Sequence, residues 1–172
     1  CILTSATLSV GENKEPLGYV KNRVGAELIN TAKIGSPYDY QSQMKIFLAR
    51  GISDPRSDQY EKDLGEWITG FVKKSKGSAF ILFTSYKLMN SVFNSISEEL
   101  KSCGINSLIQ GRNMPRNRLL KKFKEDSSSV LFGTDSFWAG VDVPGDALSN
   151  VIVTRIPFAV PNHPLIASRL EQ

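Results

Sequence analysis

The chain has 172 residues, 41% of them hydrophobic, which is enough for one domain with a sizeable core. Its net charge of +4 permits a polyanionic partner without requiring one. One histidine and two cysteines argue against a histidine-based metal site, an iron–sulfur cluster in this segment and a disulfide framework. No apolar run is long enough to cross a membrane, so we expect no membrane partner and a reducing, cytoplasmic setting.

The first fifty residues give weak structural signals. Cys1–Thr4 is apolar and predicts the end of a buried strand, and Met44–Ala49 is also strand-like. Ser9–Arg23 is polar and contains glycine and proline, which predicts a loop with one helical turn. The chain opens on a strand-like run and stops at Gln172 on a helix-like one, so we expect it to be a piece of a longer protein.

After these residues, helices and strands alternate. Apolar residues at helical spacing predict helices at Gln59–Lys74, Lys87–Cys103 and Arg116–Lys124. Short apolar runs predict strands at Ala79–Phe83, Ile105–Ile109, Ser129–Phe132 and Val151–Thr154. Such alternation is typical of an α/β domain, a three-layer sandwich whose mainly parallel sheet is covered by helices on both faces.

Polar residues follow three of the predicted strands, at Thr84–Ser85, Gln110–Gly111 and Gly133–Thr134. Right-handed crossovers would bring these strand ends to one edge of the sheet, which is where open α/β sheets bind ligands. The stretch Leu131–Gly145 is the richest of them, because it offers hydroxyls and carboxylates between glycines that permit close approach to a ligand. It is therefore the predicted binding loop.

Four segments, in this order, resemble the second motor domain of superfamily 2 helicases, closest to the DinG and XPD group. Thr4–Leu8 resembles the "SAT" motif that links the two motor domains, and Leu82–Tyr86 resembles motif IV. Gln110–Gly111 and the basic helix after it are similar to the segment before motif V. Gly133–Ser149 resembles DinG motif V over its whole length and is the most specific of the four.

The resemblance implies a RecA-like fold with residues 1–30 as the end of motor domain 1 and the crossover between the domains. Residues 31–172 would be the C-terminal helicase domain, truncated before motif VI. It further implies that ATP and Mg²⁺ are bound mainly by the first motor domain and that no catalytic residue lies in this segment. The implied partners are single-stranded DNA and the first motor domain of the same chain, in the cytoplasm of a bacterium.

Within motif V, the resemblance implies that Thr134 contacts the nucleic-acid backbone and that Gly140 and Asp142 face the nucleotide. Neutral hydroxyls bind phosphates without reading sequence, and a carboxylate can accept a hydrogen bond from a ribose hydroxyl. The structural alternatives are that Thr134 caps the turn after Gly133 and that Asp142 only shapes a turn before Pro144.

Thr84 and Ser85 are further candidates for backbone contact, and their alternative role is to cap the helix that follows. Ser5 and Thr7 belong to the motif that would couple nucleotide state to the DNA track. Phe137 and Trp138 could stack on bases, but packing beneath their own loop is the favoured interpretation. A possible phosphate-facing patch, whose alternative is a solvated helix face, comprises Arg116, Arg118, Lys121 and Lys122.

The chain departs from the family pattern at Ala139, where a glutamate is usual, so no role of that acidic group can be transferred. It contains neither a GxxxxGK(S/T) phosphate loop nor a DEAH-like box, and motif VI with its arginines is expected beyond Gln172. These features leave open a non-catalytic nucleic-acid-binding or regulatory module on the same fold. A small-molecule enzyme is poorly supported, because no acid, base or nucleophile cluster is visible.

Overall fold

The computed structural model of the chain describes residues 2–5, 8–9, 17–112, 114–157 and 168. The chain divides into two compact units, Cys1–Leu48 and Ala49–Gln172. The first unit carries two short helices, α1 (Gly18–Val24) and α2 (Tyr40–Gln43), and neither contains a buried residue. Helix α1 is longer than the single turn expected in this region.

The two strands expected before Gly51 are wrong. Residues 2–4 and 44–49 form no strand, and their side chains are exposed, Ile46 and Phe47 by 74% and 70%. A strand requires a hydrogen-bonded neighbour, and among the described residues no segment pairs with either run. An apolar run alone therefore misled the prediction, because it shows no sign of whether a neighbouring strand exists.

The second unit is built on four parallel strands in the spatial order β2-β3-β1-β4. The strands are β1 (Ala79–Leu82), β2 (Asn106–Ile109), β3 (Ser129–Gly133) and β4 (Asn150–Val153). The helices are α3 (Gln59–Lys74), α4 (Tyr86–Ser102) and α5 (Arg116–Glu125), with 3₁₀ turns η1 (Asp135–Phe137) and η2 (Gly145–Ala147). The predicted alternation and the parallel sheet are confirmed.

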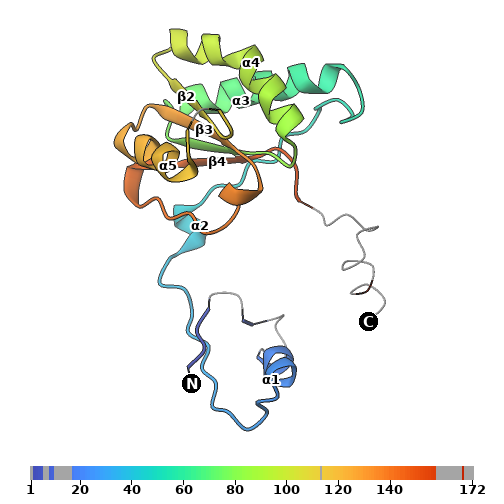
Figure 1. Ribbon diagram of the computed structural model, residues 1–172, viewed down its shortest axis with the longest axis vertical. Coiled ribbons are helices and arrows are strands. Elements are labelled where there is room, and N and C mark those ends of the chain that lie inside the picture. Colours follow the sequence, from blue (N-terminus) through green and yellow to red (C-terminus); the bar gives the residue numbers. More distant parts are fainter. Residues whose placement is uncertain (1, 6–7, 10–16, 113, 158–167, 169–172) are drawn as a thin grey trace. The chain divides into compact units, whose positions relative to one another are not determined.

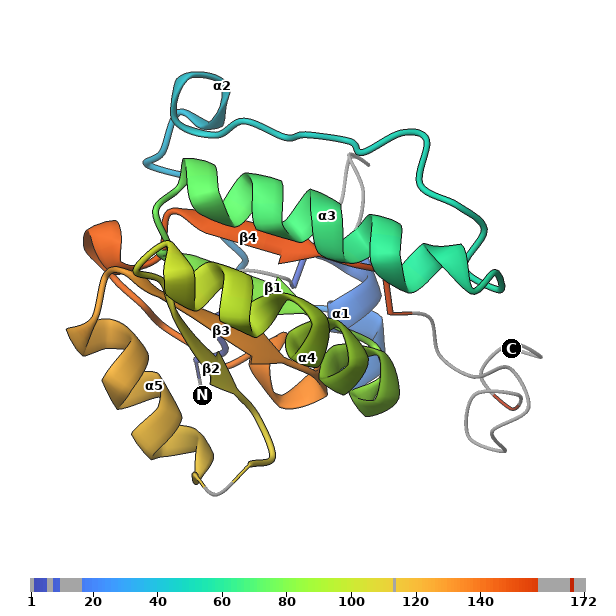
Figure 2. The same cartoon turned by 90° about the horizontal axis from the view of Figure 1, so that it is seen from above.

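Helices cover both faces of this sheet, as predicted (Figures 1 and 2). Successive residues of β1 point to opposite faces: Ala79 and Ile81 pack with α3 and α4, whereas Phe80 and Leu82 pack with α5. The apolar stripes of α3 and α4 are buried at a spacing of three or four residues, which is the reason these segments form helices that lie on the sheet. The result is three layers.

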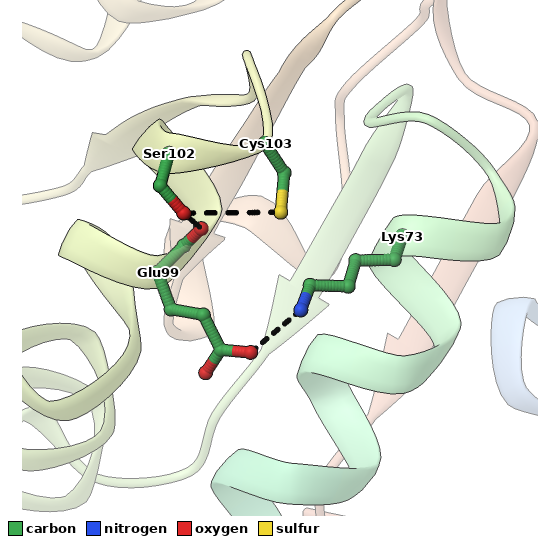
Figure 3. A network of polar contacts seen from close by, with 4 residues as sticks. All are labelled: Lys73, Glu99, Ser102 and Cys103. Carbon is green, nitrogen blue, oxygen red and sulfur yellow. Dashed lines mark hydrogen bonds and ion pairs between the residues drawn. The ribbon is translucent and has the colours of Figure 1, made fainter.

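A polar contact joins α3 to α4 at the surface (Figure 3). Lys73 Nζ donates a hydrogen bond to Glu99 Oε1 at 2.6 Å, and this bond raises the pKa of Lys73. Ser102 donates to the backbone oxygen of Glu99 at 2.7 Å and stands 4.0 Å from the sulfur of Cys103. Because both charged side chains are exposed, the pair adds little to the stability of the fold.

Asp126 organises the turn between α5 and β3. Its carboxylate accepts hydrogen bonds from the hydroxyl and the amide of Ser128, at 2.6 and 3.0 Å, and from Nδ2 of Asn106 at 2.8 Å. The hydrogen bonds from Ser128 and Asn106 lower the pKa of Asp126. One side chain thus fixes the start of β3 against the start of β2.

Replacing this carboxylate should change how stability depends on pH. The folded pKa of Asp126 lies below the unfolded one, so its contribution is present above about pH 4 and is lost as the pH falls through the folded pKa. Asp126→Asn should therefore lower the free energy of unfolding at pH 7 by on the order of 1 kcal/mol, and by less below about pH 4. Urea unfolding at several pH values measures this, and an equal loss at every pH would contradict it.

Candidate functional site

The polar strand ends lie along one edge of the sheet, as predicted, because all four strands run in the same direction. In spatial order this edge carries Gln110 after β2, Thr134 after β3, Thr84 after β1 and Thr154 after β4. The hydroxyl of Thr154 donates to the backbone oxygen of Leu82 at 2.9 Å and so belongs to the sheet itself. The remaining three polar groups define the candidate site.

Thr134 is buried, with 2% of its surface exposed, and the side chain of Gln110 covers it. The amide of Thr134 donates to Gln110 Oε1 at 2.7 Å, and the hydroxyl of Thr134 donates to the same oxygen at 3.2 Å. At its other end, Gln110 Nε2 donates to Tyr86 Oη at 2.6 Å and to Ser136 Oγ at 3.1 Å. A phosphate contact by Thr134 stays a prediction, and it requires the Gln110 side chain to move.

The loop after Thr134 is held down by its two aromatic side chains. Phe137 is buried edge-on against Phe80, with ring centroids 6.3 Å apart. Trp138 is half-buried, and its Nε1 donates to the backbone oxygen of Phe83 at 3.2 Å. The packing role favoured for this pair is confirmed. Phe137 folds so closely over Gly133 that a Cβ there would lie 2.9 Å from its ring.

Arg116 of α5 holds the far part of this loop. Its Nε donates to the backbone oxygen of Ser136 and its Nη2 to that of Gly140, both at 3.1 Å. The guanidinium also lies 5.4 Å from the ring centroid of Phe137. Arg116 is half-buried and uses these donors within the protein, whereas the other members of the predicted basic patch, Arg118, Lys121 and Lys122, are exposed. A phosphate-facing role stays a prediction.

Gly140 and Asp142 are exposed, and the reason lies in the residues next to them. Val141 and Val143 are partly buried against the α5 side of the core, so alternate residues of the segment point outward. Gly140 has a φ of +65°, and no atom lies within 4 Å of where its Cβ would be. This open space and the outward carboxylate are compatible with the predicted nucleotide-facing role, which stays a prediction.

The hydroxyl of Ser85 accepts a hydrogen bond from the Leu88 amide at 3.5 Å, and Ser85 thereby caps α4. Thr84, one residue before it, is half-buried at the end of β1. Contact of either with nucleic acid stays a prediction. Of the coupling motif, Ser5 is exposed in the first unit and Thr7 lies outside the described residues, so their role is likewise a prediction.

Sequence reasoning missed two polar side chains of this edge. The first is Gln110, which was expected only to mark a strand end and was given no role. The second is Arg112, which was noted only as part of the basic stretch; its Nη2 donates to Asn90 Oδ1 at 3.2 Å and to Asn94 Oδ1 at 2.8 Å, and its guanidinium lies 4.9 Å from the centroid of Phe93. Two asparagines four residues apart lie on one helix face, and this spacing was the available signal.

A hollow of about 610 Å³ lies elsewhere, between α4, β2 and α5. Lysines and carboxylates line it together, and it does not include the strand-end residues or the loop, so it is not the candidate site. Within the described ranges, no group of three histidine, cysteine, aspartate or glutamate side chains could hold a metal ion. In the same part of the chain, no helix is long and apolar enough to cross a membrane.

The fold is an α/β domain whose polar strand ends meet at one edge of the sheet, and comparison with known proteins shows its class. Residues 68–172 match the family described as "Helicase C-terminal domain", and the chain belongs to this family. It is 35% identical over 170 residues to the ATP-dependent DNA helicase YoaA of Haemophilus influenzae, an alignment that covers 99% of the chain and 26% of that protein.

Two further relatives support the DinG-type resemblance, which is confirmed. The chain is 32% identical over 176 residues to the 3'-5' exonuclease DinG of Bacillus subtilis, covering 99% of the chain and 19% of that protein. It is 33% identical over 181 residues to the ATP-dependent DNA helicase DinG of Photobacterium profundum, covering 99% and 25%. The chain therefore spans roughly a fifth to a quarter of the length of these relatives.

Gly133 should tolerate no side chain. Gly133→Ala would press a methyl group against the Cβ and ring of Phe137, and such overpacking should cost about 1–3 kcal/mol of unfolding free energy. The matched control is Gly70→Ala, because Gly70 lies in α3 with no atom within 4 Å of its Cβ position, and alanine there should stabilise by up to about 1 kcal/mol. Urea unfolding compares the two, and equal effects would contradict the packing described.

Removing the two hydrogen bonds that Arg116 donates to the loop should increase the loop's local opening. Arg116→Gln would remove hydrogen bonds from a charged donor to two backbone oxygens, so amide exchange across residues 136–141 should accelerate roughly tenfold. Arg118→Gln removes an equal charge from an exposed position on the same helix and should leave that exchange unchanged. Hydrogen–deuterium exchange measured by mass spectrometry distinguishes the two variants. Indistinguishable protection in both would show that these two hydrogen bonds do not hold the loop.

Proposed function

We propose that this chain acts as the second motor domain of an ATP-dependent DNA helicase of the DinG family. The observation that carries the proposal is one edge of the parallel sheet, where Thr84 and Thr134 follow neighbouring strands. The loop after Thr134, which Arg116 binds, exposes Gly140 and Asp142 at its surface. In this arrangement one edge of the sheet would contact both the nucleotide and the DNA strand. The first motor domain of the same protein is its proposed partner, and the bacterial relatives support action in the cytoplasm.

The proposed DNA contacts use neutral hydroxyls. Thr84, Ser85 and Thr134 follow β1 and β3, which are neighbours in the sheet, so their hydroxyl-bearing segments are adjacent. Hydroxyls and backbone amides bind phosphate oxygens without reading the bases, which suits a motor that must move along any sequence. The exposed cations of α5 would add a sequence-independent attraction to the polyanion.

The proposed nucleotide contacts lie on the same loop, two residues apart. The space beside Gly140 admits a ligand close to the backbone, and the carboxylate of Asp142 can accept hydrogen bonds from ribose hydroxyls. Bound ATP would supply the phosphoryl-transfer chemistry that drives movement. The chain has no phosphate loop, so we assign the main phosphate and Mg²⁺ contacts to the first motor domain.

One observation favours a second candidate, a non-catalytic nucleic-acid-binding or regulatory module. Ala139 is exposed on the loop at the position where related motifs usually carry a glutamate, so the loop surface lacks that acidic group. A module of this kind would bind single-stranded DNA through the same strand edge without hydrolysing ATP. ATP hydrolysis by the full-length protein, stimulated by single-stranded DNA, separates the two candidates.

Two substitutions in the full-length protein should separate the two halves of the site. Thr134→Val removes one hydroxyl and should weaken single-stranded DNA binding about fivefold, equally for all base compositions. Asp142→Ala should instead raise the KM for ATP with little effect on DNA affinity. Fluorescence anisotropy and steady-state ATPase assays measure these effects.

The matched control for Thr134→Val is Thr154→Val, because the Thr154 hydroxyl bonds the backbone oxygen of Leu82 at the end of β1. It should leave DNA affinity unchanged. If Thr134→Val and Thr154→Val bind DNA as the wild type does, the proposed backbone contact is wrong.

A further inference from the structure

The orientation of the Gln110 amide follows from its neighbours. The backbone amide of Thr134 can only donate a hydrogen bond, so the Gln110 atom 2.7 Å from it must be the carbonyl oxygen, Oε1. The other end is then the NH₂ group, which has two protons for its two neighbours, Tyr86 Oη and Ser136 Oγ. One side chain thus joins the ends of β2 and β3 to α4 and the loop.

Two donors of one residue converge on a single oxygen in this arrangement. The amide and the hydroxyl of Thr134 both point at Gln110 Oε1, at 2.7 and 3.2 Å. A phosphate oxygen accepts hydrogen bonds from such pairs of donors. The amide oxygen is neutral and remains attached to the protein, so a charged phosphate oxygen in the same place would form stronger hydrogen bonds.

We propose that Gln110 Oε1 occupies the place of a DNA phosphate oxygen at Thr134, and that single-stranded DNA binds by displacing the Gln110 side chain. This inference rests on the proposed function and deepens it. In the absence of DNA the exchangeable amide satisfies both Thr134 donors, which would otherwise be buried without partners. Gln110 therefore lowers the affinity for DNA while keeping the site in its binding geometry, and is a positioning residue.

Displacement also breaks the hydrogen bonds at the other end of the amide. Tyr86 begins α4, and Ser136 belongs to the loop whose backbone oxygens Arg116 binds. When Gln110 leaves Thr134, its bonds to Tyr86 and Ser136 are lost or rearranged, so the loop that carries Gly140 loses one of its fixed contacts. The exchange thus links DNA occupancy to the proposed nucleotide-facing loop.

The test measures binding of a fluorescent oligo-dT strand to the full-length protein. Gln110→Ala removes the competing oxygen and should tighten binding roughly threefold to tenfold, whereas structural damage to the site would weaken it. Gln110→Glu keeps an acceptor for both Thr134 donors and adds a charge that repels phosphate, so it should weaken binding. Tyr86→Phe removes one of the two hydroxyls that bond Gln110 Nε2 and should tighten binding by a smaller factor.

The matched control is Gln59→Ala, which removes an exposed glutamine whose amide donates to Asp63 on its own helix, and it should leave affinity unchanged. The gain from Gln110→Ala should be smaller in the Thr134→Val background, because valine keeps the backbone amide but lacks the hydroxyl that shares the phosphate oxygen. Unchanged or weaker DNA binding by Gln110→Ala overturns the displacement proposal alone, provided that Thr134→Val binds DNA more weakly than the wild type does. Failure of the wild-type protein to bind the strand overturns the proposed function as well.

Discussion

Parallel hydrogen bonding along both edges of β1 is the constraint on which the rest of the second unit depends. The register pairs Leu82 with Gly133 of β3 on one side and with Val153 of β4 on the other, so the three strands end level. Because residues alternate across the sheet, the same register sends one set of side chains to α3 and α4 and the other set to α5. The core and the polar strand edge are therefore consequences of one pairing.

The sequence was sufficient for features that depend on local periodicity. The helix Gln59–Lys74 was predicted to the residue from apolar residues at helical spacing, of which Tyr60, Leu64 and Ile68 are buried. Met44–Ala49 failed because strand formation depends on a partner segment that the run itself does not contain. The contact between Gln110 and Thr134 joins residues 24 positions apart, and only the assembled sheet brings them together. Likewise, nothing in the basic run separated Arg116 from its exposed neighbours.

The structural and functional roles weighed for the hydroxyls are compatible with each other. Ser85 caps a helix through a long hydrogen bond of 3.5 Å, and Thr134 donates to an amide that a ligand could replace. Neutral partners of this kind satisfy buried groups at rest and can be exchanged without separating an ion pair.

The link between α5 and the loop has a mechanical consequence. Arg116 bonds the loop at two backbone oxygens, and Leu119 and Phe123 of the same helix are buried against the sheet. A displacement of the loop would therefore act on the helix through these two hydrogen bonds. In the motor proposed above, this link would pass a displacement of the loop to α5, whose outer surface carries Arg118, Lys121 and Lys122.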